Sequence, residues 1–343
     1  MIDKNEYILY VKTENGTPWK AIFEVLKDLL REGTIEFIND ELNPEKLAKK
    51  LETEENNFSD SENDEEGETY NSNTNNEIDN VSGMKLFAVN TTQTVLVSLK
   101  LGKFLFSEFI CNKYKTPVSI NLAMFHKVIR GLSTTDNLTL SISNKHPSKL
   151  KIRIDNNDEN KSKEVELTLL DIDQNNMSLP ITKYKVAIVM KANEFNKVCK
   201  EMSAMHEQME IRCELDRVTF TCEDKSIKQT TEYKTGIVGG NEIIKIIRPD
   251  NITEENKMEI ILGLFELKNL VLFSKCQQLC EDIIIYMENK KPIIIRYAMS
   301  ESAYMILALG PINNRTNADD NYYDSDDSEN TDEDDDDNSS DTE

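Results

Sequence analysis

The chain has 343 residues, of which 63 are acidic, 40 are basic and 3 are His, so its formal net charge at pH 7 is −23. Taken whole, this charge argues against a nucleic-acid partner, because affinity for a phosphate backbone comes mainly from Lys and Arg side chains that release its counterions. No stretch approaches the roughly 18 uninterrupted apolar residues of a membrane span, and the start MIDKNEYILY lacks the apolar core of a secretory signal.

The negative charge is concentrated in two segments. Residues 41–82 hold 13 acids and 3 bases, and residues 313–343 hold 14 acids and 1 base. Both segments are rich in Asn and Ser and poor in large apolar side chains, so they cannot bury enough surface to offset the entropy of ordering. We therefore predict that both are disordered. The other 270 residues contain 36 acids and 36 bases and are enough for two domains of ordinary size.

Four segments repeat apolar residues at helical spacing, and each precedes segments in which the period drops towards two. The predicted helices are Pro18–Arg31, Leu122–Leu132, Asn193–Met205 and Leu264–Leu279. The predicted strands are Thr34–Ile38, Met84–Val89, Thr94–Leu101, Leu138–Ser143, Leu150–Ile154, Val165–Leu170, Met209–Leu215, Arg217–Cys222, Asp282–Met287, Pro292–Tyr297 and Tyr304–Leu309. The pattern predicts four units of one short helix followed by antiparallel strands, with the acidic segment 41–82 inserted in a loop between two strands.

A polar stretch, DIDQNNMSLPIT at 171–182, divides the predicted elements into two halves of similar length and content. We interpret it as the linker of an internal duplication. The predicted organisation is a first domain at 1–170 with its acidic insertion, a connecting loop at 171–182, a second domain at 183–312 and an acidic tail at 313–343. The fold class is α+β, with helices on one face of antiparallel sheets.

Basic side chains gather on the polar faces of the four predicted helices, although the ordered part of the chain is neutral overall. They are Lys20 and Lys27, Lys127 and Arg130, Lys197 and Lys200, and Lys268 and Lys275. Acidic neighbours such as Glu24, Asp28, Glu194, Glu201 and Glu266 allow a plainer interpretation, in which each helix has a solvated face of mixed charge. If the helices lie side by side, however, their cations form one surface that can follow phosphates without reading bases.

At this point the sequence resembles the sliding clamp family of proliferating cell nuclear antigen, over essentially all 270 ordered residues. The segments that carry the resemblance, in order, are LKDLL at Leu26–Leu30, SINLAMFHKVIR at Ser119–Arg130, LTLLDID at Leu167–Asp173, EFNKVCKEMS at Glu194–Ser203, LKNLVLFSKC at Leu267–Cys276, KPIIIRY at Lys291–Tyr297 and LALGPI at Leu307–Ile312. Their order and spacing, together with the duplication, make the resemblance specific.

The resemblance implies a homotrimeric ring of duplicated clamp domains, with antiparallel sheets outside and the four helices lining a pore for duplex DNA. The eight basic residues above fall on the pore-lining positions of the family. The ring would close by pairing edge strands of neighbouring subunits. The matching segments are Glu164–Leu169 and Ser226–Tyr233, and the implied interface residues are Glu164, Val165, Glu166, Leu167, Lys228 and Thr230. From sequence alone, these strands could equally pair only within the subunit.

The resemblance also implies an apolar pocket beside the connecting loop that takes peptide motifs of partner proteins. The matching positions are Val89, Met177, Leu179, Pro180, Pro292 and Pro311. The apolar Met-x-Leu-Pro in an otherwise polar linker fits a docking site, although the same side chains could pin the linker to its own sheet. The implied partners are double-stranded DNA bound without sequence preference, further copies of the chain, a DNA polymerase, a clamp loader, and a ligase or flap nuclease.

The residues offer no pattern of catalysis, cofactor binding or metal binding. His126, His146 and His206 are scattered, and Cys276 and Cys280 have no second pair or nearby His at zinc-ligand spacing. We predict a binding protein that is not an enzyme, without cofactor or metal, with reduced cysteines and an intracellular location. The implied site of action is a nucleus or, for a viral protein, the place where viral DNA is replicated.

Two other functions remain open at this stage. The chain could be one subunit of a checkpoint-type heterotrimeric clamp, in which phosphorylation of the Ser-containing acidic tail switches partners. It could also be an acidic interaction protein, such as a chaperone for basic proteins, in which the two acidic segments are the active parts.

Overall fold

The computed structural model describes residues 4–46, 82–156, 158–172, 184–238, 241–249 and 258–312. The first half contains β1 (Tyr7–Thr13), α1 (Thr17–Leu29), β2 (Glu32–Ile38), β3 (Gly83–Val89), β4 (Val95–Gly102), β5 (Glu108–Cys111), β6 (Lys115–Asn121), α4 (Leu122–Ile129), β7 (Asp136–Ser143), β8 (Lys149–Asn156) and β9 (Lys161–Thr168). The second half contains β10 (Val186–Lys191), α5 (Ala192–Ser203), β11 (Gln208–Cys213), β12 (Arg217–Glu223), β13 (Lys228–Lys234), β14 (Ile237–Val238), β15 (Asn241–Glu242), β16 (Ile244–Ile247), β17 (Ile261–Glu266), α7 (Leu267–Ser274), β18 (Asp282–Met287), β19 (Ile293–Ser300) and β20 (Ala303–Leu309).

The two halves repeat one order of strands. In the first half, the strands follow the orders β5-β1-β7-β8-β9 and β6-β2-β3-β4, and in the second half the equivalent orders are β16-β10-β18-β19-β20 and β17-β11-β12-β13. Within the chain, β20 pairs with β4. This pairing joins a set of strands from each half into one nine-stranded antiparallel sheet. This repeat of helices and antiparallel sheets is the α+β architecture that the sequence predicts.

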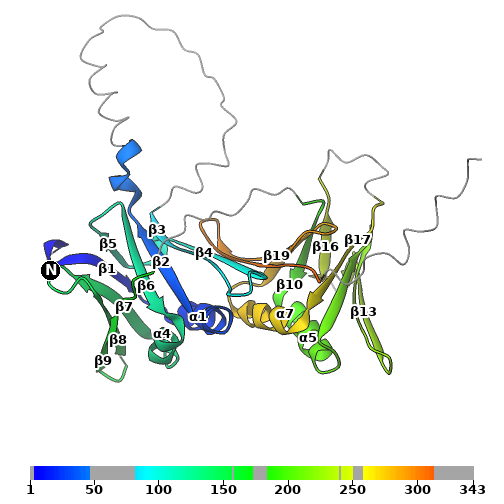
Figure 1. Cartoon of the computed structure of the whole chain (residues 1–343), viewed down its shortest axis with the longest axis horizontal. Coiled ribbons are helices and arrows are strands. Elements are labelled where there is room, and N and C mark those ends of the chain that lie inside the picture. Colours follow the sequence, from blue (N-terminus) through cyan, green and yellow to red (C-terminus); the bar gives the residue numbers. More distant parts are fainter. Residues whose placement is uncertain are drawn as a thin grey trace, which may run out of the picture.

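The sheets form an arch, and the helices lie on its concave side (Figure 1). Each helix begins where the local sequence favours it. Pro18 lies in the first turn of α1, where its missing N–H costs little, and Asn121 caps α4 by accepting a hydrogen bond from the amide of Met124 at 2.9 Å. The apolar faces of the helices are buried against the sheets. Neighbouring helices also contact each other; the ring centroids of Phe23 in α1 and Phe125 in α4, for example, are 4.5 Å apart.

Two predicted boundaries are wrong. The fourth helix does not begin at Leu264, because residues Ile261–Glu266 are strand β17, paired with β11; helix α7 starts at Leu267 and continues into a 3₁₀ turn, η4 (Lys275–Gln278). The acidic insertion does not begin at residue 41, because Asp40–Leu42 forms a 3₁₀ turn, η2, that Asn39 caps. Glu41 is held there by Lys103 at 2.8 Å.

The remaining insertion residues, 47–81, and the tail, 313–343, lie outside the described residues, as does most of the connecting loop. The disorder predicted for them therefore stays a prediction. None of the helices among the described residues combines the length and the apolar composition needed to cross a bilayer.

Tyr297 links the outer sheet to helix α7 through one buried hydrogen bond. Its hydroxyl donates to the carbonyl oxygen of Phe273 at 2.8 Å, and the side chain is only 1% exposed. Replacing Tyr297 with Phe should lower the free energy of unfolding by about 1–2 kcal/mol, because the buried carbonyl loses a donor and water cannot replace it. Urea denaturation at fixed protein concentration measures this.

The matched control is Tyr286→Phe, since Tyr286 is a half-buried tyrosine of the neighbouring strand β18. No hydrogen bond from its hydroxyl is found among the described residues, so this variant should differ from the wild type by less than about 0.5 kcal/mol. Equal losses in the two variants would contradict the role of the Tyr297 hydroxyl.

Candidate functional site

Helices α1, α4, α5 and α7, together with η4 at the end of α7, form one continuous layer, although they come from segments far apart in the chain. Along the concave side of the arch, the order is α4, α1, α7 and α5 (Figure 1), and each helix contacts the next. The contact between α5 and α7 includes a buried hydrogen bond from the Asn196 side chain to the Ser274 hydroxyl at 2.9 Å. The layer is therefore a packed surface rather than four separate helices.

The eight predicted DNA-binding residues all lie on this layer. Because the apolar faces of the helices are buried against the sheets, the cations lie on the opposite, open side. Five are exposed and three are half-buried; in chain order the exposed ones are Lys127, Arg130, Lys197, Lys200 and Lys268, and the half-buried ones are Lys20, Lys27 and Lys275. The structure thus brings together residues that the sequence places in four separate segments.

The cations differ in how many carboxylates lie near them. Within the described residues, no carboxylate lies within 4.0 Å of Lys197 or Lys200, whereas Lys268 lies 3.0 Å from Glu266. Lys27 and Lys275 both contact Asp28, at 2.6 and 3.0 Å. Positive charge is therefore more fully compensated at the seam between α1 and η4 than on α5.

His126 lies among these charges on α4, and its pKa is below the ordinary value for histidine. Partial burial is the main cause, because it penalises the charged ring, and the positive charge of Lys27 acts in the same direction. The imidazole is therefore mainly neutral near pH 7 and adds no fixed cation to the surface.

Strands β9 and β13 lie at opposite ends of the arch (Figure 1), and among the described strands each pairs on one side only. In an antiparallel pair, successive residues direct their N–H and C=O groups alternately towards and away from the partner. The amide of Leu169 donates to Ser148 at 2.9 Å, and that of Thr235 donates to Asp216 at 2.8 Å, which fixes the alternation.

Counting from these two bonds identifies the backbone groups that face the open edges. They belong to Ser162, Glu164, Glu166 and Thr168 in β9 and to Lys228, Thr230, Glu232 and Lys234 in β13. The predicted interface residues Glu164, Glu166, Lys228 and Thr230 are in this set. Val165 and Leu167 are half-buried and direct their backbone groups to β8. Among the described residues, each edge thus has four residues whose backbone N–H and C=O groups are unpaired. Equal numbers allow the two edges to pair with each other.

Charged side chains on both edges form ion pairs within the chain. Lys149 donates to Glu166 at 2.9 Å, and this hydrogen bond and charge hold the pKa of the Glu166 carboxyl below its ordinary value. Lys228 lies 2.8 Å from Glu223 of the neighbouring strand. Both ion pairs are exposed to solvent and can rearrange at little cost.

The predicted peptide pocket is only partly within the described residues. Met177, Leu179 and Pro180 lie outside them. The other three residues share one end of adjacent strands: Val89 ends β3, Pro292 precedes β19, and Pro311 follows β20. A row of facing residues crosses these strands: Val89 is opposite Leu96, Leu96 is opposite Ala308, and Ala308 is opposite Ile294. Pro292 and Pro311 lie close to the end of this row in sequence.

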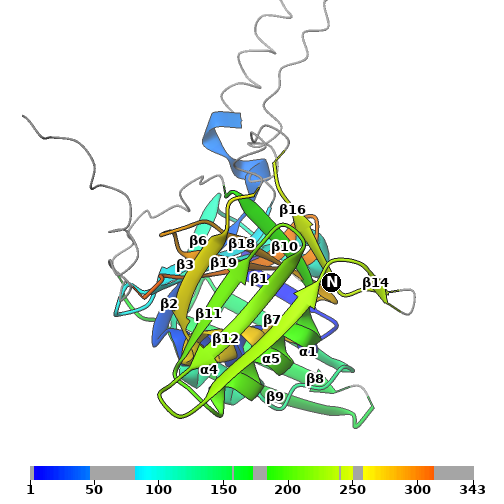
Figure 2. The same ribbon diagram turned by 90° about the vertical axis from the view of Figure 1, so that its right-hand side faces the viewer.

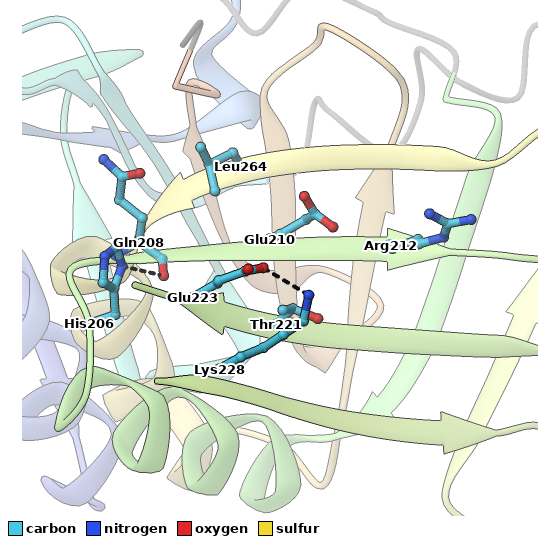
Figure 3. Close-up of a pocket in the computed structure, with 8 residues that line it drawn as sticks. All are labelled: His206, Gln208, Glu210, Arg212, Thr221, Glu223, Lys228 and Leu264. Carbon is cyan, nitrogen blue, oxygen red and sulfur yellow. Dashed lines mark hydrogen bonds and ion pairs between the residues drawn. The ribbon is translucent and has the colours of Figure 1, made fainter. Parts of the chain in front are cut away.

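A separate polar groove of about 470 Å³ lies over the sheet of the second half (Figure 3). It is lined by His206, Gln208, Glu210, Arg212, Thr221, Glu223, Lys228 and Leu264. His206 accepts a hydrogen bond from the amide of Gln208 at 3.0 Å, and the strands that carry these residues face the viewer in Figure 2. No group of His, Cys, Asp and Glu with metal-binding geometry occurs among the described residues. The groove reaches Lys228 at the open edge of β13.

Two parts of this site escaped prediction from the sequence. Asp28 was predicted only as an acidic neighbour, because its contact with Lys275 joins residues 247 positions apart. The outward backbone groups of Ser162, Thr168, Glu232 and Lys234 were also missed. Strand alternation could have suggested them, but only once the pairing of β8 and β12 was known.

Comparisons with known protein families match both halves of the chain. The family model for the C-terminal domain of proliferating cell nuclear antigen matches residues 178–312, and the model for its N-terminal domain matches residues 71–177. Together the two models cover more than half of the 343 residues.

Individual relatives agree. The chain is 29% identical over 232 residues to the proliferating cell nuclear antigen of Chaetomium thermophilum, covering 68% of this chain and 86% of the relative. It is 28% identical over 238 residues to a probable DNA polymerase sliding clamp of Acanthamoeba polyphaga mimivirus, covering 68% of this chain and 48% of that relative.

Among solved structures, the chain resembles the proliferating cellular nuclear antigen of Entamoeba histolytica. The TM-score is 0.67 at 17% identity, and the match covers 89% of this chain and 99% of the other. At this identity the likeness establishes the fold.

Proposed function

The chain belongs to the proliferating cell nuclear antigen family, and from this premise we propose that it is a DNA sliding clamp and a processivity factor for DNA polymerase. The single observation that carries the mechanism is the layer of four helices, whose cations lie on the concave side of the arch. Copies of the arch joined end to end would enclose a pore lined by these cations.

Ring closure is supported by a joint that already exists inside the chain. Strand β20 of the second half pairs with β4 of the first, and the equivalent strands in the repeat are β9 and β13, the two open edges. Two copies that pair β9 with β13 would repeat the internal joint between chains. We therefore assign the interface to these strands, with Glu164, Val165, Glu166, Leu167, Lys228 and Thr230 at its centre.

The repeat also gives the register of this pairing. Leu122 and Leu267 are equivalent residues of the two halves, since they begin α4 and α7, and the strand registers carry this equivalence to the outer strands. Glu164 then takes the place of Ile306, and Thr230 takes that of Ser98, which are opposite each other in the internal joint. In the resulting register, Glu164 faces Thr230 and Glu166 faces Lys228.

Two independent features agree with this register. All four of these residues direct their backbone groups to the open edges, as hydrogen-bonded partners must. In addition, the carboxylate of Glu166 lies opposite the ammonium of Lys228, and opposite charges in facing positions stabilise a strand pair. Pairing also covers two strand edges that would otherwise invite aggregation.

The proposed mechanism depends on enclosure of the duplex by the ring, with only weak contacts between them. A closed ring stays on DNA because the duplex passes through it, so its contacts need only be mobile and directed at phosphates. We assign these contacts to Lys20, Lys27, Lys127, Arg130, Lys197, Lys200, Lys268 and Lys275. The ring contributes no covalent chemistry; it holds the polymerase near the primer end.

The finer assignments remain proposals that the resemblance supports. They are a ring of three identical subunits, the domain limits 1–170 and 183–312 with the connecting loop 171–182, and loading by a clamp loader. They also include docking of polymerase, ligase or flap nuclease at the pocket of Val89, Met177, Leu179, Pro180, Pro292 and Pro311. We propose action where DNA is replicated, in a nucleus or at a viral replication site.

Primer extension on singly primed circular DNA tests the proposal. With the polymerase and clamp loader of the same source, the wild-type chain should lengthen the products made in one binding event by at least tenfold. A truncated chain without residues 313–343 should do the same, because the function lies in the helices and edges. Unchanged product length with the wild-type chain would contradict the processivity function, and loss of activity on truncation would favour an acidic interaction protein.

A further inference from the structure

The cationic surface contains one acidic side chain placed between two of its lysines. Asp28 lies on the last turn of α1, at the seam where α1 meets η4, and its side chain is 28% exposed. Its Oδ1 lies 2.6 Å from Lys27 Nζ, and its Oδ2 lies 3.0 Å from Lys275 Nζ. A single carboxylate thus binds two of the eight cations, one from each half of the chain.

The electrostatics indicate that Asp28 is ionised. Partial burial opposes its charge, but hydrogen bonds from Lys27 and Lys275 and the positive charges of both outweigh that penalty, so the pKa of the carboxyl lies below its ordinary value. His126 and Arg130 of α4 and Glu24 of α1 also lie close to Lys27 and Asp28. Asp28 is therefore a carboxylate at neutral pH, between two lysines.

A lysine that is already paired gains less from a phosphate than an unpaired one. To bind DNA fully, Lys27 or Lys275 must leave Asp28, and the carboxylate then lies unpaired beside the polyanion. Lys197 and Lys200 on α5 have no such competitor within 4.0 Å among the described residues. The seam between α1 and η4, in the middle of the helix layer, should therefore contribute less to phosphate binding than α5.

We propose that Asp28 is an internal counter-ion that holds Lys27 and Lys275 back from DNA phosphates and so limits how tightly the ring grips the duplex. This inference rests on the proposed function. A weaker grip at the seam keeps the contacts mobile, which sliding requires, while the unpaired lysines of α5 retain the duplex near the surface.

A double-mutant cycle tests the proposal in the full chain. Duplex DNA affinity is measured by fluorescence anisotropy over a series of salt concentrations for wild type, Asp28→Asn, Lys275→Gln and the double variant. Asp28→Asn should raise affinity several-fold at low salt and steepen the plot of log K against log salt by about 1 for each phosphate that a released lysine newly neutralises. Lys275→Gln should lower affinity in both backgrounds, and the fold-loss should be several times larger in the Asp28→Asn background than in the wild-type background.

The cycle separates electrostatics from loosening of the seam. Asp28→Asn and Lys275→Gln both break the contact between α1 and η4, so a purely structural effect would move affinity in the same direction in both. Thermal unfolding of each variant records that shared effect. The proposal is overturned if Asp28→Asn leaves affinity and salt dependence unchanged, or if Lys275→Gln has equal effects in both backgrounds.

Lys197→Gln serves as the reference for the proposed function itself. It removes an unpaired cation of α5 and should weaken binding in both backgrounds. If Lys197→Gln weakens binding while Asp28→Asn has no effect, only the counter-ion role fails. If neither substitution affects DNA binding, the proposed function fails with it.

Discussion

Replacing Glu166 with proline should convert the ring into monomers while leaving each subunit folded. Glu166 is one of the β9 residues whose N–H faces the open edge, so replacing it with proline removes a hydrogen bond of the proposed subunit joint and inserts the proline ring there. Within the subunit, β9 is an edge strand, and proline is tolerated on the open side of such strands. Light scattering should show a mass near 39.4 kDa instead of three times that value.

Glu166→Ala is the matched control, because it also loses the carboxylate but keeps the backbone N–H. This variant should remain a ring, since one exposed ion pair contributes only about 0.2–1 kcal/mol. Circular dichroism should be the same for both variants. A Glu166→Pro chain that keeps the wild-type mass would show that β9 is not the subunit joint.

Reversing the charges of Lys197 and Lys200 together should abolish processive synthesis. Both side chains are exposed on α5, and no carboxylate lies within 4.0 Å of either among the described residues, so both can meet phosphates without first leaving a partner. The double variant, Lys197→Glu with Lys200→Glu, replaces attraction with repulsion. We expect DNA affinity to fall by at least tenfold at low salt, and the slope of log K against log salt to weaken by about 1 for each phosphate that is no longer neutralised.

The control variant carries the same change in net charge away from the helices. Lys113 follows β5 and Lys245 lies in β16; both are exposed, and in Figure 1 these strands lie on the far side of the arch from the helix layer. Lys113→Glu with Lys245→Glu should extend primers as the wild type does. Equal loss of activity in both double variants would mean that net charge, and not the helix layer, controls DNA binding.

Much of the fold could be predicted from periodicity, because the relevant interactions are local. The helices α1, α4 and α5 were predicted within a few residues, since each is an amphipathic run of apolar and polar residues. The start of α7 was wrong because β17 and α7 follow each other without a break, and Ile261–Phe273 reads as one apolar segment. Only the pairing of β17 with β11 separates them.

The candidate site could be predicted only where a family pattern supplied it. Single helices with two lysines each are unremarkable in a sequence, and their assembly into one surface depends on contacts between α4, α1, α7 and α5. The ion pair between Asp28 and Lys275 depends on the packing of α1 against η4. Neither residue's neighbours in the sequence could have predicted it. The open edges are equally invisible until the strand order is known.

The continuity of the nine-stranded sheet across β20 and β4 has a consequence for how such a ring would open. In the proposed ring, joints inside chains alternate with joints between chains, and both kinds share one geometry. The internal joint is tied covalently and buries alternate residues of an apolar strand, whereas β9 is exposed along most of its length. If the ring is strained, the β9–β13 joints would therefore be expected to separate before the joints inside the chains.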